Sequence, residues 1–144
     1  MDRVNIFDPQ CAYDDTDPDG YRAGMDRFGG RINARRIGGS VYEIPPGQSI
    51  CPYHYELGDE EWLIVLAGRP TIRHPGGEDV LAPGDTVCFP EGAEGAHKVT
   101  NHDSETVRVL MISTRRLPSV AVYPDSDKVG VWEGFGAPLG LYRR

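Results

Sequence analysis

The stretch that decides the fold is GQSICPYHYELGDEEWLIVLAG, residues 47–68, followed after a short interval by GDTVCFPEGAEGAHKVTN, residues 84–101. In both stretches short apolar runs alternate with Gly, Pro and Asp, which is typical of β-strands joined by tight turns. Both stretches also carry side chains of the types that bind metal ions in proteins. The four potential ligands are His54, Glu56 and Glu61 in the first stretch and His97 in the second.

The same spacing of strands and turns continues on both sides of these stretches. Turn residues recur at roughly 8 to 12 residue intervals, which is typical of an all-β sandwich or barrel. No segment shows the sustained apolar period of a helix. We expect strands at residues 40–44, 50–56, 61–66, 71–73, 79–81, 86–89, 97–101, 106–113 and 120–123. The predicted fold is therefore all-β.

A single domain accounts for all 144 residues. We expect a barrel core over residues 31–123 and an extended N-terminal arm over residues 1–30, where acidic residues cluster around Pro18 and Gly20. The tail over residues 124–144 is rich in turn residues, with aromatic side chains spread through it. Aromatic residues in such a tail favour packing, so we expect it to wrap onto the domain or onto a partner subunit.

Composition excludes several classes of partner. A net charge of -7 argues against nucleic acid. The basic pairs are interpreted as solvated surface; they are Arg35–Arg36, Arg115–Arg116 and Arg143–Arg144. No apolar run approaches the ~20 residues of a membrane span, and residues 1–9 lack the apolar segment of a signal peptide. Three cysteines without CxxC spacing argue against a disulfide framework. We therefore expect a cytoplasmic protein with no membrane partner.

Strand geometry predicts that the potential ligands meet. Side chains alternate along a strand, so His54 and Glu56 project from the same face. Glu61 follows the turn at residues 58–59, and we expect it on the adjacent antiparallel strand. His97 joins them only if the sheet closes. Two imidazoles and two carboxylates at one point are donors suited to a divalent metal ion.

These two stretches resemble the paired motifs of the cupin superfamily. The first motif matches at Gly47, His54 and Glu61-x6-Gly68, with Gly47 one residue further upstream than usual. The second motif has two extra residues before its histidine, and it matches at Gly84, Pro90, Gly92, His97 and Asn101. The resemblance implies a small jelly-roll β-barrel, commonly a homodimer, with its site inside the barrel.

The resemblance also implies three metal ligands, namely His54, Glu61 and His97. Glu56 stands where the family pattern has a second metal-binding histidine, so its role is inferred from its place in the motif. Glu56 is a fourth ligand, a general base, or the mark of a site that has lost its metal, and the sequence leaves these alternatives open. Oxygen donors favour Mn, Fe, Zn or Ni over Cu(I). We expect Asn101 to brace the backbone, and His74 and His102 to lie at the surface.

The predicted function is that of a metal-dependent cupin acting on a small organic molecule. Its chemistry is oxygenase-like, or isomerase- or lyase-like, because cupins host all of these reactions and the fold alone does not choose among them. The alternative is a non-catalytic cupin that binds a small molecule, with a weakened or absent metal site.

Overall fold

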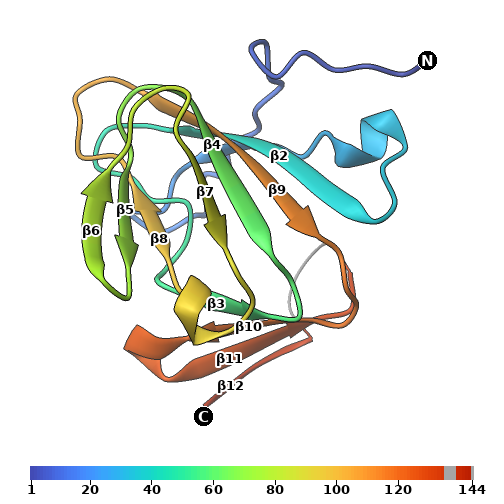
Figure 1. Ribbon diagram of the computed structural model, residues 1–144, viewed down its shortest axis with the longest axis vertical. Helices are drawn as coiled ribbons and strands as arrows, with labels where there is room; N and C mark the ends of the chain where they lie inside the picture. Colours follow the sequence, from blue (N-terminus) through green and yellow to red (C-terminus); the bar gives the residue numbers. More distant parts are fainter. Residues whose placement is uncertain (135–138, 144) are drawn as a thin grey trace.

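The computed structural model describes residues 1–134 and 139–143, and it consists almost entirely of antiparallel strands (Figure 1). The all-β prediction is confirmed. The strands are β1 Gly24–Asp26, β2 Ile37–Ile44, β3 Tyr55–Leu57, β4 Glu61–Ala67, β5 Thr71–His74, β6 Gly77–Val80, β7 Thr86–Phe89, β8 Lys98–Thr100, β9 Val107–Thr114, β10 Ser119–Tyr123, β11 Lys128–Trp132 and β12 Gly140–Arg143. The described residues also form the single-turn 3-10 helices η1 Gly29–Ile32, η2 Ala93–Gly95 and η3 Pro124–Ser126. Within the described residues, no helix has the length and apolar character needed to span a membrane.

The strands form three sheets, with the arrangement of a jelly-roll. The orders are β1-β2-β9-β4-β7, β12-β11-β10-β3 and β6-β5-β8. In Figure 1 the small β6-β5-β8 sheet lies opposite the five-stranded sheet, and the β12-β11-β10-β3 sheet lies across one end of both. The candidate site lies near this end, where β3, β4 and the start of β8 approach one another.

The main core fills the space between the sheets. Alternation along β4 sends Leu63 and Val65 inward, and both side chains are almost fully buried. Glu61 begins the same strand with the same parity, so its carboxylate also faces the interior. The buried members of this cluster are Ile44, Leu63, Val65, Ile72, Phe89, Val99, Val107 and Val109.

The N-terminal segment covers the outer face of the five-stranded sheet. Phe28 packs on Val41 and Leu110, with Val4 and Ile6 alongside them. The five-stranded sheet is therefore covered on both faces around Ile64 and Leu66, which explains why residues 63–67 are apolar without a break, whereas Trp62 remains exposed. Part of the expected arm forms β1, which pairs with β2 along the sheet edge.

The strand expected over residues 50–56 is wrong in extent and in pairing. Only Tyr55–Leu57 is a strand, and it pairs with β10 and not with β4. Pro52 has no N–H to donate, so a ladder of hydrogen bonds cannot run through it. Asp59 accepts hydrogen bonds from the Thr114 hydroxyl at 2.9 Å and the Arg116 amide at 2.9 Å. This anchoring makes the turn at residues 58–59 a corner between two sheets and not a hairpin.

The expected C-terminal wrap takes the form of two added strands. β11 pairs with β10, and β12 pairs with β11, so the tail widens the sheet that carries β3. Residues 135–138 and 144 of the predicted tail, and with them half of the last basic pair, lie outside the described residues.

Candidate metal centre

A pair of backbone hydrogen bonds brings the two motifs together. The His54 amide donates to the His97 carbonyl at 3.1 Å, and the His97 amide donates to the His54 carbonyl at 2.8 Å. The two imidazole rings lie with centroids 4.7 Å apart. Two residues far apart in the sequence thus present their side chains to one point.

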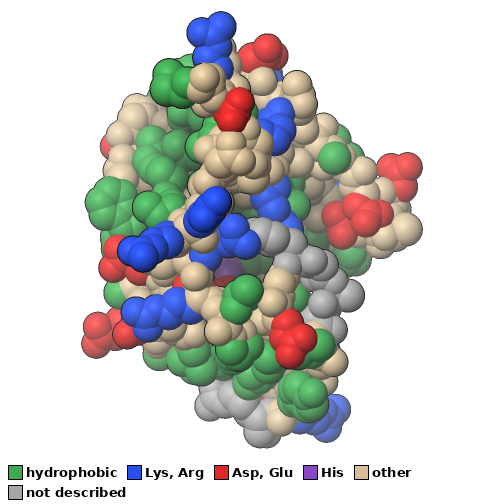
Figure 2. All heavy atoms as spheres, turned by 90° about the vertical axis from the view of Figure 1, so that its right-hand side faces the viewer, with side chains coloured by type: hydrophobic (Ala, Val, Ile, Leu, Met, Phe, Trp, Pro, Cys, Tyr) green, Lys and Arg blue, Asp and Glu red, His purple; other side chains and the backbone are tan. Residues whose placement is uncertain are grey.

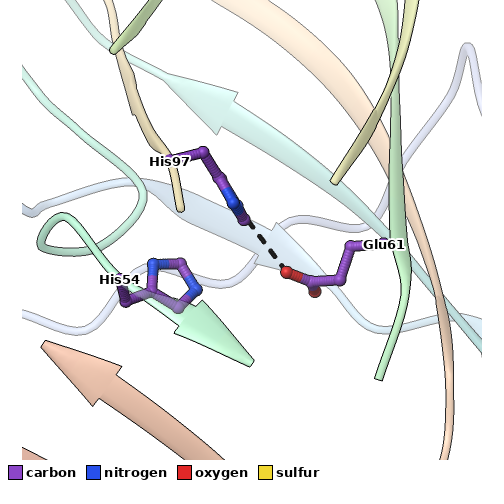
Figure 3. Close-up of side chains that lie close together, drawn as sticks. All are labelled: His54, Glu61 and His97. Carbon is purple, nitrogen blue, oxygen red and sulfur yellow. Dashed lines mark ion pairs between the residues drawn. The ribbon is translucent and has the colours of Figure 1, made fainter. Parts of the chain in front are cut away.

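Three of the four predicted residues form one compact group (Figure 3). Single donor atoms of His54, Glu61 and His97 all lie within 4.8 Å of one another. Nε2 of His97 is 3.6 Å from Oε2 of Glu61. Two donors bonded to one ion at about 2.1 Å lie roughly 3.0–3.4 Å apart, so small side-chain movements suffice to hold an ion.

Hydrogen bonds orient both imidazoles for ligation. Nδ1 of His97 lies 2.9 Å from the Gly95 carbonyl oxygen, and Nδ1 of His54 lies 3.0 Å from the Pro52 carbonyl oxygen. A carbonyl only accepts, so Nδ1 carries the hydrogen and the lone pair of each neutral ring is on Nε2. Metal-bound histidines are held in this way by their second nitrogen. Stacking of Phe89 on the His97 ring, with centroids 3.7 Å apart, fixes that ring further.

Burial sets the protonation of the three residues. It lowers the pKa of His97 to about 3, helped by the neighbouring His54, and it also lowers the pKa of His54. Both rings are therefore neutral near pH 7, as ligation requires. Burial, with a smaller contribution from Asp59, raises the pKa of Glu61 to about 7. A divalent cation would favour the ionised carboxylate, so the donor set fits such an ion.

Glu56 stands beside this group and is not part of it. Its Oε1 is 3.8 Å from Nε2 of His54, and its Oε2 is 3.5 Å from the Ser119 hydroxyl. Burial raises the pKa of Glu56 to about 8, with further contributions from the carboxylates of Glu61 and Asp59. Glu56 thus lies beside the three-residue group, and its carboxyl, like that of Glu61, has a pKa raised by burial.

Three arginines lie near the site, and the sequence alone did not predict this position. Arg115 and Arg116 line a cavity of about 220 Å³ together with Arg27, Glu56 and Glu61. Their interpretation as plain solvated surface is therefore incomplete. Arg115 and Arg116 come directly after β9, which pairs with β4. Their position just past the end of a predicted strand was the feature of the sequence that could have placed them near the site. Arg27 lies in the N-terminal segment, whose sequence has no periodic pattern that would place it at the site.

Other polar residues of the motifs hold the backbone. Asn101 is fully buried, and its side-chain amide donates to the carbonyls of Ile44 at 2.8 Å and Glu105 at 2.7 Å. It braces the turn, as expected. His74 contacts Asp79 at 3.0 Å near the β5–β6 turn, and His102 is exposed, so neither belongs to the site.

Comparison with known proteins agrees with this geometry. A model of the cupin domain family matches residues 40–113, just over half of the chain, so the chain belongs to the cupin family. A candidate sugar phosphate isomerase from Acidithiobacillus ferrooxidans is 28% identical, with a TM-score of 0.79 over 93% of this chain and 83% of that one. A comparison with curated proteins gives no match.

Two further solved structures share the fold. A cupin-superfamily sugar phosphate isomerase from Silicibacter pomeroyi has a TM-score of 0.85 and 21% identity, over 99% of this chain and 92% of that one. A polyketide cyclase from Streptomyces resistomycificus has a TM-score of 0.67 and 23% identity, over 83% of each chain. At these identities the likeness concerns the fold alone.

Proposed function

We propose that this cupin is a metal-dependent enzyme that moves protons on a small organic substrate, with isomerase- or lyase-type chemistry. His54, Glu61 and His97 hold the ion, which is Mn, Fe, Zn or Ni. Such an ion supplies Lewis acidity toward a substrate oxygen. The observation that carries the proposal is the position of Glu56, which lies next to the ligand group without belonging to it.

Glu56 is the proton-transferring residue of this proposal. A general base works best when its pKa lies near the operating pH, and burial brings the pKa of Glu56 to about 8. The Ser119 hydroxyl holds one carboxylate oxygen, so the other faces the ligand group. In this role Glu56 would take a proton from the substrate carbon next to a carbonyl group and would return it to another atom of the substrate. The likeness to a candidate sugar phosphate isomerase supports the same reaction class.

Hydrogen exchange with solvent tests the proposal. Metal-loaded protein is incubated in D2O with a panel of small hydroxy-aldehydes, hydroxy-ketones and their phosphates, and deuterium entry beside the carbonyl is followed by NMR. We expect exchange with at least one compound, at least about 100-fold slower in Glu56→Gln. Glu60→Gln, an exposed neighbour, is the matched control.

The experiment also separates the alternatives. Binding of panel compounds without exchange, in protein of full metal content, would identify a non-catalytic binding protein. Oxygen consumption by the Fe(II)-loaded protein would identify an oxygenase. Equal exchange rates in Glu56→Gln and wild type would contradict the role given to Glu56.

The homodimer and the cytoplasmic location stay predictions. Large apolar side chains are exposed around the β12-β11-β10-β3 sheet, and they include Leu57, Leu117, Leu139 and Leu141. A second copy packed there would cover them. Light scattering on the purified protein measures the oligomeric state directly.

A further inference from the structure

The site opens to the surface through a mouth that carries positive charge. Glu61 lies on the walls of three adjoining cavities: an inner one of about 70 Å³ with His54 and His97, and outer ones of about 220 Å³ and 390 Å³. Both outer cavities are also lined by Arg27 and Arg115. Figure 2 faces this mouth and shows a histidine inside a hollow, with basic side chains gathered around it.

Three arginines from two segments make up the mouth. Arg27 directly follows β1, and Arg115 and Arg116 directly follow β9. The backbone of the second segment is fixed, because the Arg115 amide donates to the Arg36 carbonyl at 3.1 Å and the Arg116 amide donates to Asp59. Arg115 and Arg116 therefore extend from an anchored backbone, and Arg27 lines the same cavity from the other segment.

The aliphatic part of the Arg115 side chain packs over Gly38. A Cβ at Gly38 would lie 3.6 Å from Cγ and 3.7 Å from Cδ of Arg115, so the arginine passes close over the bare backbone of β2. Gly38 and its neighbour Gly39 both line the larger outer cavity. The absence of a side chain at Gly38 leaves room beside the aliphatic stem of Arg115, whereas a Cβ at Gly39 would lie 2.7 Å from the Phe28 ring.

The three arginines stand out because both the whole chain and this cavity are otherwise acidic. The chain carries seven more acidic than basic residues, and the cavity floor contains Glu56, Glu61 and Asp59. An anion would be repelled by such a floor unless cations met it at the entrance. Among residues 1–134 and 139–143, the guanidinium of Arg116 makes no ion pair with a carboxylate, so it is available to a ligand.

We propose that Arg27, Arg115 and Arg116 form a subsite for the anionic group, a phosphate or a carboxylate, of the substrate. The inference rests on the proposed function, because the same molecule would place its reacting end at Glu61 and Glu56. Arginine suits this task because its planar fork of donors matches phosphate and carboxylate oxygens. The larger outer cavity, of about 390 Å³, has the size of a small-molecule site. The substrate class is thus a small anionic hydroxy-carbonyl compound.

Anion binding to metal-free protein tests the subsite separately from the chemistry. Metal is removed so that phosphate and malonate cannot bind through the ion, and both probes are titrated by calorimetry. We expect binding that weakens with added salt, and roughly tenfold weaker binding in Arg115→Gln and in Arg116→Gln. Arg115→Lys retains part of the affinity. The control is Arg69→Gln, an exposed arginine in the β4–β5 turn outside these cavities.

The outcomes of these titrations either support the arginine subsite or overturn it. Binding of phosphate alone supports a phosphate ester, binding of malonate alone supports a carboxylate, and loss of either binding in the arginine variants supports the subsite. Absence of binding to wild-type protein, or equal affinity in wild type and in a folded Arg27→Gln, Arg115→Gln, Arg116→Gln triple variant, overturns it. Arginine-dependent binding in a protein that shows no hydrogen exchange would leave the subsite standing and remove only the proposed function.

Discussion

Nε2 of His97 lies 3.6 Å from Oε2 of Glu61, although the two residues come from different motifs, Glu61 from the start of β4 and His97 from the segment just before β8. Two contacts fix the His97 ring: Phe89 stacks on its face, and the Gly95 carbonyl accepts a hydrogen bond from Nδ1. The contact is therefore built into the fold before any ion binds. It makes the metal centre the natural starting point for experiments.

Replacing His97 by alanine should abolish metal binding and the stability that comes with it. A ligand that binds only the folded state stabilises it by about 2.7 kcal/mol when its free concentration is about 100 times Kd. We expect Zn or Mn to raise the melting temperature of wild-type protein by several degrees and to leave His97→Ala unchanged. His102→Ala, which removes an exposed histidine, should behave as wild type. A metal-dependent shift in His97→Ala would refute the assignment of this ligand.

The two glutamates should differ in their effect on metal affinity. Glu61 belongs to the compact donor group, whereas Glu56 does not. Titration with Zn and a competing chelator should show affinity reduced by more than about 100-fold in Glu61→Gln and by less than about tenfold in Glu56→Gln. If the order is reversed, Glu56 is the essential ligand, and its role as a general base falls.

Stability of the metal-free protein should decrease as pH rises from 6.5 to 8. Burial raises the pKa of Glu56 from 4.5 to about 8 and that of Glu61 from 4.5 to about 7, so the folded state keeps protons that the unfolded state has lost. Unfolding then becomes easier with rising pH. The lowered pKa of His97 acts in the opposite direction, but only below its usual value of 6.5.

Denaturant titrations of metal-free wild type and Glu56→Gln at pH 6.5 and 8 measure this effect. Wild type should lose on the order of 1 kcal/mol between the two values, and Glu56→Gln should lose less. A saturating divalent metal should remove the decrease, because it favours the ionised Glu61. Parallel pH profiles for the two proteins would show that Glu56 is not buried in the way described.

Gly95 should not tolerate a side chain. A Cβ there would lie 1.8 Å from the Pro90 carbonyl oxygen, so η2 would have to move. That movement would displace the carbonyl that holds Nδ1 of His97. We expect Gly95→Ala to lower both the melting temperature and the metal content, with exposed Glu94→Ala as control. Normal metal content in Gly95→Ala would show that the Gly95 carbonyl does not orient His97.

Asn101 should matter for stability and not for metal binding. Removing its amide leaves the buried carbonyl of Ile44 without this donor, which costs about 1–3 kcal/mol. Asn101→Ala should unfold at a lower denaturant concentration, with metal affinity unchanged in the folded protein. Loss of metal affinity at full folding would give Asn101 a direct role in the site.

The motifs predicted the members of the site better than the path of the chain between them. Alternation within β4 places Glu61 on the face of Leu63 and Val65, and this parity is written in the sequence. Gly58 and Asp59 are typical turn residues, so the sequence predicts a tight turn between two paired strands. Only the tertiary contacts of Asp59 with Thr114 and Arg116 make it a corner between sheets. Sequence patterns report local conformation, and those contacts are non-local.

The position of the three arginines could not be predicted either, because it too depends on non-local contacts. Arg115 and Arg116 form a basic pair like any other until β9 is known to end beside Glu61, where Ser113 pairs with that residue. Arg27 joins them from a segment without periodicity. Only the assembled sheets show that these residues share an opening.

Anomalous X-ray scattering from crystals grown with Mn or Zn tests the metal centre most directly. We predict one peak at the metal's absorption edge, bonded to Nε2 of His54, Nε2 of His97 and a carboxylate oxygen of Glu61, with Glu56 outside bonding distance. Absence of a peak there at saturating metal, or a peak only elsewhere in the molecule, would contradict the metal centre.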